Sequence, residues 1–128
     1  MMFGGVEVQE FIMDYLDRNQ AYFKGNSEFI YRHPETRFEK YQSSSYLAKA
    51  CKEQAFTVER KVANLETTLI ATYGTGEPVS GSLGDFDALS ELGQQPNETS
   101  YLPLGNVGHG CGHNLLGTGS FAAAWRGE

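Results

Sequence analysis

The sequence is poor in the features of a disulfide-stapled, membrane-spanning or secreted chain. Its 128 residues include only two cysteines, Cys51 and Cys111, far apart in sequence. Two cysteines cannot form a disulfide framework or a zinc site with four cysteine ligands. No apolar run approaches the ~20 residues of a membrane-spanning helix, and the first residues have no basic segment followed by an apolar one. We therefore expect a cytoplasmic protein without membrane contact.

Basic residues are also scarce. Ten Lys and Arg oppose sixteen Asp and Glu, which gives a formal net charge of -6, and the basic residues form no cluster. Nucleic acids and anionic membranes are bound through concentrated positive charge, so neither is an expected partner. The length fits one domain over residues 1–128, and a hydrophobic content of 40% is typical of a folded globular chain.

Helical periodicity dominates the first part of the chain. Apolar residues recur at helical spacing over residues 7–31, which predicts one long amphipathic helix with Gly25 as the candidate point for a kink. Pro34 ends it, and His33 is expected to be a structural residue at the helix end rather than a ligand. The serines at 43–45 predict the start of a second helix, with Cys51 as a small core residue on its inner face.

Strand-like segments follow. Residues 56–62 and 67–73 are rich in β-branched and aromatic residues, and residues 78–83 are predicted as a third strand that carries Asp85 and Asp87 to its carboxyl end. Residues 90–110 form a long loop, and residues 114–125 a last helix. We predict an α/β domain whose helices all pack on one small central sheet.

One short stretch concentrates metal-binding chemistry. In Gly108-His109-Gly110-Cys111-Gly112-His113-Asn114, a thiol and two imidazoles fall within five residues among glycines. Thiolate sulfur and neutral imidazole nitrogen are ligands of zinc and similar ions, and glycine gives the open backbone that such close ligands need. Cys111 and His113 are therefore the leading candidate ligands. Further ligands have to be carboxylates or come from outside the chain.

Two carboxylates stand nearby in the segment Gly84-Asp85-Phe86-Asp87-Ala88. Residues at i and i+2 of an extended segment point the same way, so Asp85 and Asp87 can reach one site together as ligands or as partners of a metal-bound histidine. The alternative is an ordinary polar turn after a strand.

These segments resemble the dinuclear-metal amidohydrolases and peptidases, a family that includes aminoacylase and the auxin-conjugate hydrolases. The residues that carry the resemblance are His33-Pro34-Glu35-Thr36-Arg37-Phe38-Glu39, residues 55–58, residues 84–89 and above all residues 108–118. The resemblance implies a zinc-peptidase-like catalytic domain with one or two Zn²⁺ or Mn²⁺ ions. It implies Cys111 and His113 as ligands, Asp87 as the orienting acid and Asp85 as a further ligand, with His109 supporting the ligands or facing the substrate.

The implied reaction is metal-dependent hydrolysis of an amide in an N-acyl or aminobenzoyl amino acid or a dipeptide. Members of the family are much longer, with a paired-glutamate segment that carries the general base, further ligands and a lid domain. This chain contains no Glu-Glu pair. We therefore expect an N-terminal fragment that is inactive by itself, completed by an oligomer or by a missing C-terminal portion. The alternatives are a non-catalytic or degenerate copy with weak metal binding, and a thiol-based redox or structural-metal module.

Overall fold

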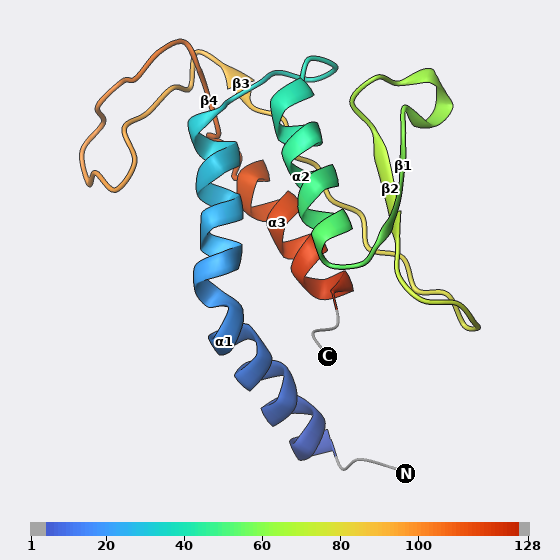
Figure 1. Ribbon diagram of the computed structural model, residues 1–128. Coiled ribbons are helices and arrows are strands. Elements are labelled where there is room, and N and C mark those ends of the chain that lie inside the picture. Colours follow the sequence, from blue (N-terminus) through green and yellow to red (C-terminus); the bar gives the residue numbers. More distant parts are fainter. Residues whose placement is uncertain (1–4, 126–128) are drawn as a thin grey trace.

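The computed structural model describes residues 5–125, which form three helices and two small antiparallel sheets (Figure 1). The elements are α1 (Gly5–Arg32), α2 (Tyr41–Glu53), β1 (Thr57–Arg60), the 3-10 helix η1 (Val62–Asn64), β2 (Leu69–Thr72), β3 (Leu89–Ser90), β4 (Val107–Gly108) and α3 (His113–Ala124). This mixture of helix and strand agrees with the α/β class at its coarsest level. In the described part of the chain, no helix is both long enough and apolar enough to span a bilayer.

Helix α1 matches its prediction and continues uninterrupted through Gly25. It ends where His33 precedes Pro34. The His33 Nδ1 atom lies 2.7 Å from the Phe29 carbonyl oxygen, and the two rings stack with their centroids 4.1 Å apart. The same carbonyl also accepts from the His33 backbone N–H at 3.1 Å, so both the backbone and the ring of His33 bind the last turn, as predicted for a structural residue at the helix end.

Helix α2 begins at Tyr41, earlier than the serine caps predicted. The Glu35 carboxylate accepts hydrogen bonds from the backbone N–H groups of Gln42, at 3.0 Å, and Ser43, at 2.9 Å. Ser43 and Ser44 are fully buried inside the helix. The prediction of a serine cap was wrong because a carboxylate from the preceding loop satisfies the first-turn donors instead.

The sheet differs most from the prediction. Strands β1 and β2 pair antiparallel, with Thr57 opposite Thr72 and Arg60 opposite Leu69. The predicted third strand at residues 78–83 does not form, and its side chains Val79 and Leu83 are 77% and 93% exposed. This segment has serine and glycine where a central strand needs consecutive large apolar residues. Residues 5–125 therefore form no open parallel sheet, and the site does not lie at the carboxyl edge of one.

The helices are also arranged differently from the prediction. Helix α2 contacts both β1 and β2, whereas α3 lies along α1 (Figure 1). Helix α3 meets the sheet region through Phe121, whose ring packs against Phe56 just before β1 at 5.9 Å. The prediction that every helix covers one sheet was wrong because the two short, two-stranded sheets are too small to support three helices.

Two buried clusters hold the elements together. The first joins Phe23, Ala50, Cys51, Phe56 and Phe121, which confirms Cys51 as a core residue. The second joins Ile30 of α1, Leu47 of α2 and Phe86 of the segment between β2 and β3. Phe86 is the middle residue of Asp85-Phe86-Asp87, so this second cluster fixes the position of the two carboxylates.

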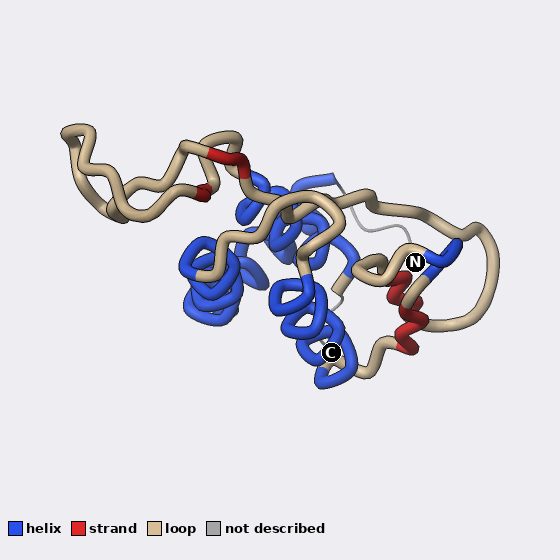
Figure 2. The backbone as a smooth tube through the Cα atoms, turned by 90° about the horizontal axis from the view of Figure 1, so that it is seen from above, coloured by secondary structure: helices blue, strands red, loops and turns tan. Residues whose placement is uncertain are grey.

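The predicted loop at 90–110 is a hairpin that projects from the helices (Figure 2). Its base is the β3–β4 pair, in which Leu89 lies opposite Gly108, and a second bridge joins Gln94 and Pro103. The Tyr31 hydroxyl donates a hydrogen bond of 2.9 Å to the Gln94 carbonyl, which ties the hairpin to α1. A side chain at Gly108 would lie 2.2 Å from the Leu92 carbonyl oxygen, so the close pairing requires glycine there.

Candidate metal centre

The Asp85-Phe86-Asp87 tripeptide presents two carboxylates on one side because its middle residue is buried. Phe86 is 8% exposed and packs in the second core cluster. Alternation in this extended segment then turns the flanking side chains away from the core. Ligand atoms of Asp85, Asp87 and His113 all lie within 4.8 Å of one another. The structure therefore brings together three of the residues singled out in the sequence.

His113 is held by Asp87. Its Nδ1 atom lies 2.6 Å from the Asp87 Oδ1 atom, and the two side chains are 27% and 15% exposed. A carboxylate can only accept, so Nδ1 carries the hydrogen in this contact, and in the neutral ring the Nε2 atom keeps its lone pair. A carboxylate that orients an imidazole in this way is the usual support of a metal-binding histidine. The role of Asp87 as the orienting acid stays a prediction, and the contact with His113 is the geometry that such a role requires.

Glycine positions His113 at the first turn of α3. Gly112 precedes the helix with φ 80°, a left-handed conformation that glycine adopts at little cost. The sharp turn lets the chain leave β4 and enter α3 within a few residues. His113 is consequently placed opposite the tripeptide although the two lie far apart in sequence.

Asp85 has a different partner. The Lys40 Nζ atom lies 2.6 Å from the Asp85 Oδ1 atom, which also accepts a 2.8 Å hydrogen bond from the Phe86 N–H. Partial burial alone would raise the pKa of Asp85. The hydrogen bonds from Lys40 and Phe86 and the charges of Lys40 and His113 outweigh it and lower the pKa overall. Asp85 is therefore held as a carboxylate.

Two backbone contacts fix the tripeptide against its neighbours. The Ala88 N–H donates to the Glu35 carbonyl at 2.8 Å, and the Ser120 hydroxyl donates to the Leu83 carbonyl at 2.7 Å. Glu35 thus joins the α1–α2 loop to the site and also caps α2. Reasoning from residues missed Glu35 and Lys40 as parts of the site. The segment that carries the resemblance included Glu35, but no local pattern marked Lys40.

Cys111 and His109 lie outside the three-residue group. Cys111 is exposed, and its role as a ligand stays a prediction. His109 is buried at 9% exposure, and its Nε2–H donates to the Ile30 carbonyl at 3.1 Å. The His109 Nδ1 atom has no hydrogen-bond partner among residues 5–125. Burial lowers the pKa of His109, so the ring is held neutral next to the site.

The donor set suits the implied ions. The Asp85 carboxylate and the His113 imidazole offer an oxygen and a nitrogen ligand that both Zn²⁺ and Mn²⁺ accept, while Asp87 supports the imidazole. So few protein ligands leave room for water, as catalytic sites require and closed structural sites do not. The residues present therefore fit a catalytic ion better than a structural one.

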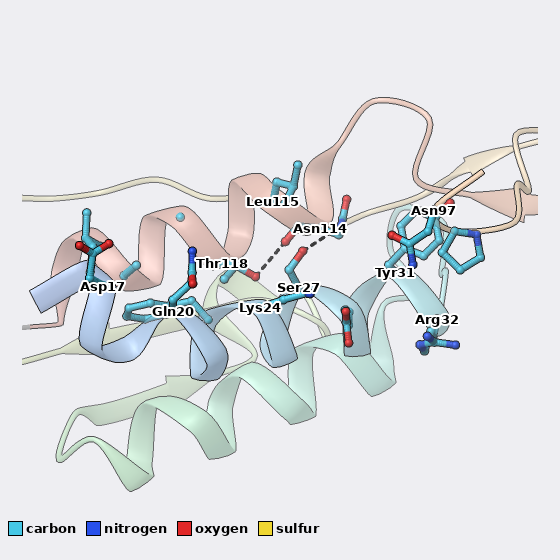
Figure 3. Close-up of a pocket in the computed structure, with 16 residues that line it drawn as sticks. Asp17, Gln20, Lys24, Ser27, Tyr31, Arg32, Asn97, Asn114, Leu115 and Thr118 are labelled. Carbon is cyan, nitrogen blue, oxygen red and sulfur yellow. Dashed lines mark hydrogen bonds between the residues drawn. The ribbon is translucent and has the colours of Figure 1, made fainter. Parts of the chain in front are cut away.

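A separate groove lies between α1 and α3 (Figure 3). It has a volume of about 800 Å³ and is crossed at its floor by a 3.0 Å hydrogen bond from the Asn114 amide to the Ser27 hydroxyl. None of the three candidate ligands lines it. The groove is thus not the metal site.

Comparison with known proteins gives a clear match to a hydrolase. The chain is 46% identical over 121 residues to a subunit of p-aminobenzoyl-glutamate hydrolase from Escherichia coli (strain K12). The alignment covers 92% of this chain and 25% of that protein, so the chain spans about a quarter of the relative's length. No protein-family profile matches the chain. The relative is a hydrolase, in agreement with the resemblance drawn from the motifs, whereas metal dependence stays a prediction.

Proposed function

We propose that this chain contributes part of the metal centre of a metal-dependent amidohydrolase whose substrate is p-aminobenzoyl-glutamate or a similar aminobenzoyl or N-acyl amino acid. The observation that carries the proposal is the grouping of Asp85, Asp87 and His113 within 4.8 Å. Its support is the identity of 46% with part of a hydrolase of that name. The reaction adds water to the amide carbonyl, breaks the C–N bond and releases a carboxylate and an amine.

The contacts support a proposed role for each residue. His113 offers the Nε2 lone pair to an ion, and Asp87 keeps the ring in that tautomer. Asp85 offers a second carboxylate. A Zn²⁺ or Mn²⁺ ion held by these residues would polarise the amide carbonyl and acidify a water molecule. His109 is neutral and buried, so it supports the site through the Ile30 carbonyl rather than by carrying charge.

The general base is proposed to lie in regions of such a hydrolase that this chain does not span. Proton transfer by a positioned base contributes about 10²–10⁴-fold to rate. The family pattern places that base in a Glu-Glu pair, which this sequence does not contain. We propose that the rest of a longer chain, or a second protein chain, supplies it.

The test measures binding and turnover separately. Purified chain is titrated with Zn²⁺ and Mn²⁺ by calorimetry and assayed for release of p-aminobenzoate from p-aminobenzoyl-glutamate, with the Escherichia coli relative as control. We expect metal binding, with turnover at least about 100-fold below the control. Chain that binds no metal contradicts the proposal. Turnover equal to the control contradicts the placement of the base outside this chain.

A further inference from the structure

The Lys40 side chain is unusual among the lysines of this chain because it is mostly buried. Its side chain is 15% exposed, whereas Lys49 and Lys61, which also pair with carboxylates, are 76% and 64% exposed. The Lys40 ammonium lies 4.6 Å from the centre of the Phe86 ring. Its aliphatic stem and its charge are therefore both positioned by the segment that carries the candidate ligands.

That position places a positive charge next to one member of the ligand group. Lys40 Nζ is 2.6 Å from Asp85 Oδ1, and Asp85 lies within 4.8 Å of Asp87 and His113 through their ligand atoms. An ion bound to Asp85 would meet this ammonium at close range. Two like charges a few ångströms apart repel strongly where water is partly excluded. The ammonium and an ion thus require the same carboxylate.

We propose that Lys40 competes with a divalent cation for the Asp85 carboxylate, and so weakens metal binding on the Asp85 side relative to the Asp87–His113 side. This inference rests on the proposed metal centre. It makes Lys40 a residue that sets the affinity of the site and, through Asp85, the number of ions held. Lys40 is a positioning residue, since it acts through Asp85 rather than on substrate.

The experiment compares wild-type chain with Lys40→Met and Lys40→Arg. Methionine keeps an apolar stem over Phe86 and removes the charge, and arginine keeps the charge. Calorimetric titration with Mn²⁺ and Zn²⁺ at one pH should show Lys40→Met binding about tenfold tighter, equivalent to ~1.4 kcal/mol. Lys40→Arg should bind within about twofold of wild type.

Lys49→Met is the matched control. Lys49 lies on α2 and pairs with Glu53 at 3.7 Å on the surface, so its loss changes the net charge equally without touching the site. We expect its metal affinity to equal that of wild type. An equal gain in Lys49→Met and Lys40→Met would overturn the inference, because the effect would then come from overall charge.

A second measurement uses wild-type chain and needs no variant. Lysine acetylation by a limiting reagent, read by peptide mass spectrometry, should speed up at Lys40 when saturating Mn²⁺ is added, and stay constant at Lys49. Unchanged acetylation at Lys40, or equal or weaker metal binding by Lys40→Met, overturns the inference while the proposed function stands. If no variant and no wild-type chain binds metal, both are overturned.

Discussion

Each side of the candidate centre has an aspartate, but the two aspartates bind partners of opposite chemistry. On one side Asp87 holds an imidazole, which can itself bind an ion; on the other Asp85 holds an ammonium, which can only compete with one. Both carboxylates come from one tripeptide around one buried ring. Two carboxylates of one tripeptide thus have partners of different chemistry, one that can bind an ion and one that cannot.

The largest effect is expected from thiol labelling, which tests whether Cys111 binds the ion together with the Asp87–His113 side. Burial raises the pKa of the Cys51 thiol to about 11, so at pH 8 only about 0.1% of it is thiolate. Cys111 is exposed. We expect iodoacetamide to modify Cys111 at least about 100-fold faster than Cys51 in the folded chain.

Adding Zn²⁺ turns this labelling into a test of ligation. If Cys111 is a ligand, the ion should slow its modification at least about tenfold, since a metal-bound thiolate is not free to react. The Cys51→Ala variant isolates the Cys111 signal, and Cys111→Ser provides the reverse control. Labelling of Cys111 that ignores saturating Zn²⁺ would contradict the thiolate as a ligand.

The next largest effect is expected from a substitution that alters the Asp87 side alone. Asp87→Asn removes the carboxylate charge that supports His113 and offers an amide N–H beside the ring, and loss of such a partner lowers metal affinity by about 10–100-fold. Calorimetry with Zn²⁺ measures it. Asp14→Asn is the control, because Asp14 pairs with Arg18 on the exposed surface of α1. Equal affinity in wild type and Asp87→Asn would contradict the assignment.

A smaller effect is expected from crowding the tripeptide, because its backbone carries both carboxylates. An alanine methyl at Gly117 of α3 would lie 3.0 Å from the Asp85 carbonyl oxygen and 3.2 Å from the Phe86 Cβ atom, whereas one at Gly119 meets nothing within 4 Å. Each change gains about 1 kcal/mol of helix propensity. Crowding should make Gly117→Ala about 1–3 kcal/mol less stable than Gly119→Ala in urea unfolding. Identical stability in both variants would show that the tripeptide shifts to accommodate the methyl group without a loss of stability.

The smallest effect concerns Asp85 and acid. Partial burial raises its pKa, but Lys40, the Phe86 N–H and His113 lower it overall, below its value of about 3.9 in the unfolded chain. The stabilisation is therefore present above about pH 4 and is lost as pH falls through the folded-state pKa. Asp85 is half-exposed, so Asp85→Asn should cost at most about 1 kcal/mol at pH 7.

The difference between wild type and Asp85→Asn should shrink at pH 3, because that pH is below the unfolded-state pKa of about 3.9 and the stabilisation falls from there towards the folded-state pKa. Urea unfolding at the two pH values measures it, with Asp14→Asn as the surface control. A difference that stays constant from pH 7 to pH 3 would mean that the side-chain charge of Asp85 contributes nothing to the fold.

The sequence predicted those parts of the molecule whose structure depends on residues close together in the chain. The periodicity of α1, the start of α3 near His113 and the same-side placement of Asp85 and Asp87 follow from spacings of a few residues. The third strand failed because residues 78–83 have no consistent alternation or apolar run. A strand needs a partner, and its pairing is decided far away in the chain.

The contacts that define the site were beyond such reasoning. Lys40 and Asp85 lie 45 residues apart, and Glu35 caps a helix while its carbonyl accepts from Ala88. Neither pairing has a local signature, because each depends on the loop between α1 and α2 meeting the segment after β2. The family resemblance marked Glu35 within a motif, but only the fold explains why a glutamate is needed there.

The β3–β4 pair at the base of the projecting hairpin makes the geometry of the candidate site independent of the length of the hairpin. Leu89 opposite Gly108 closes the hairpin within two residues of Asp87 on one side and just before His109 on the other. The entropic cost of closing a loop grows only slowly with its length, so residues added between the β3–β4 pair and the tip reduce the stability only slightly. The tip is thus where this molecule can accept insertions, tags or new sequence while the distance from Asp87 to His113 stays the same.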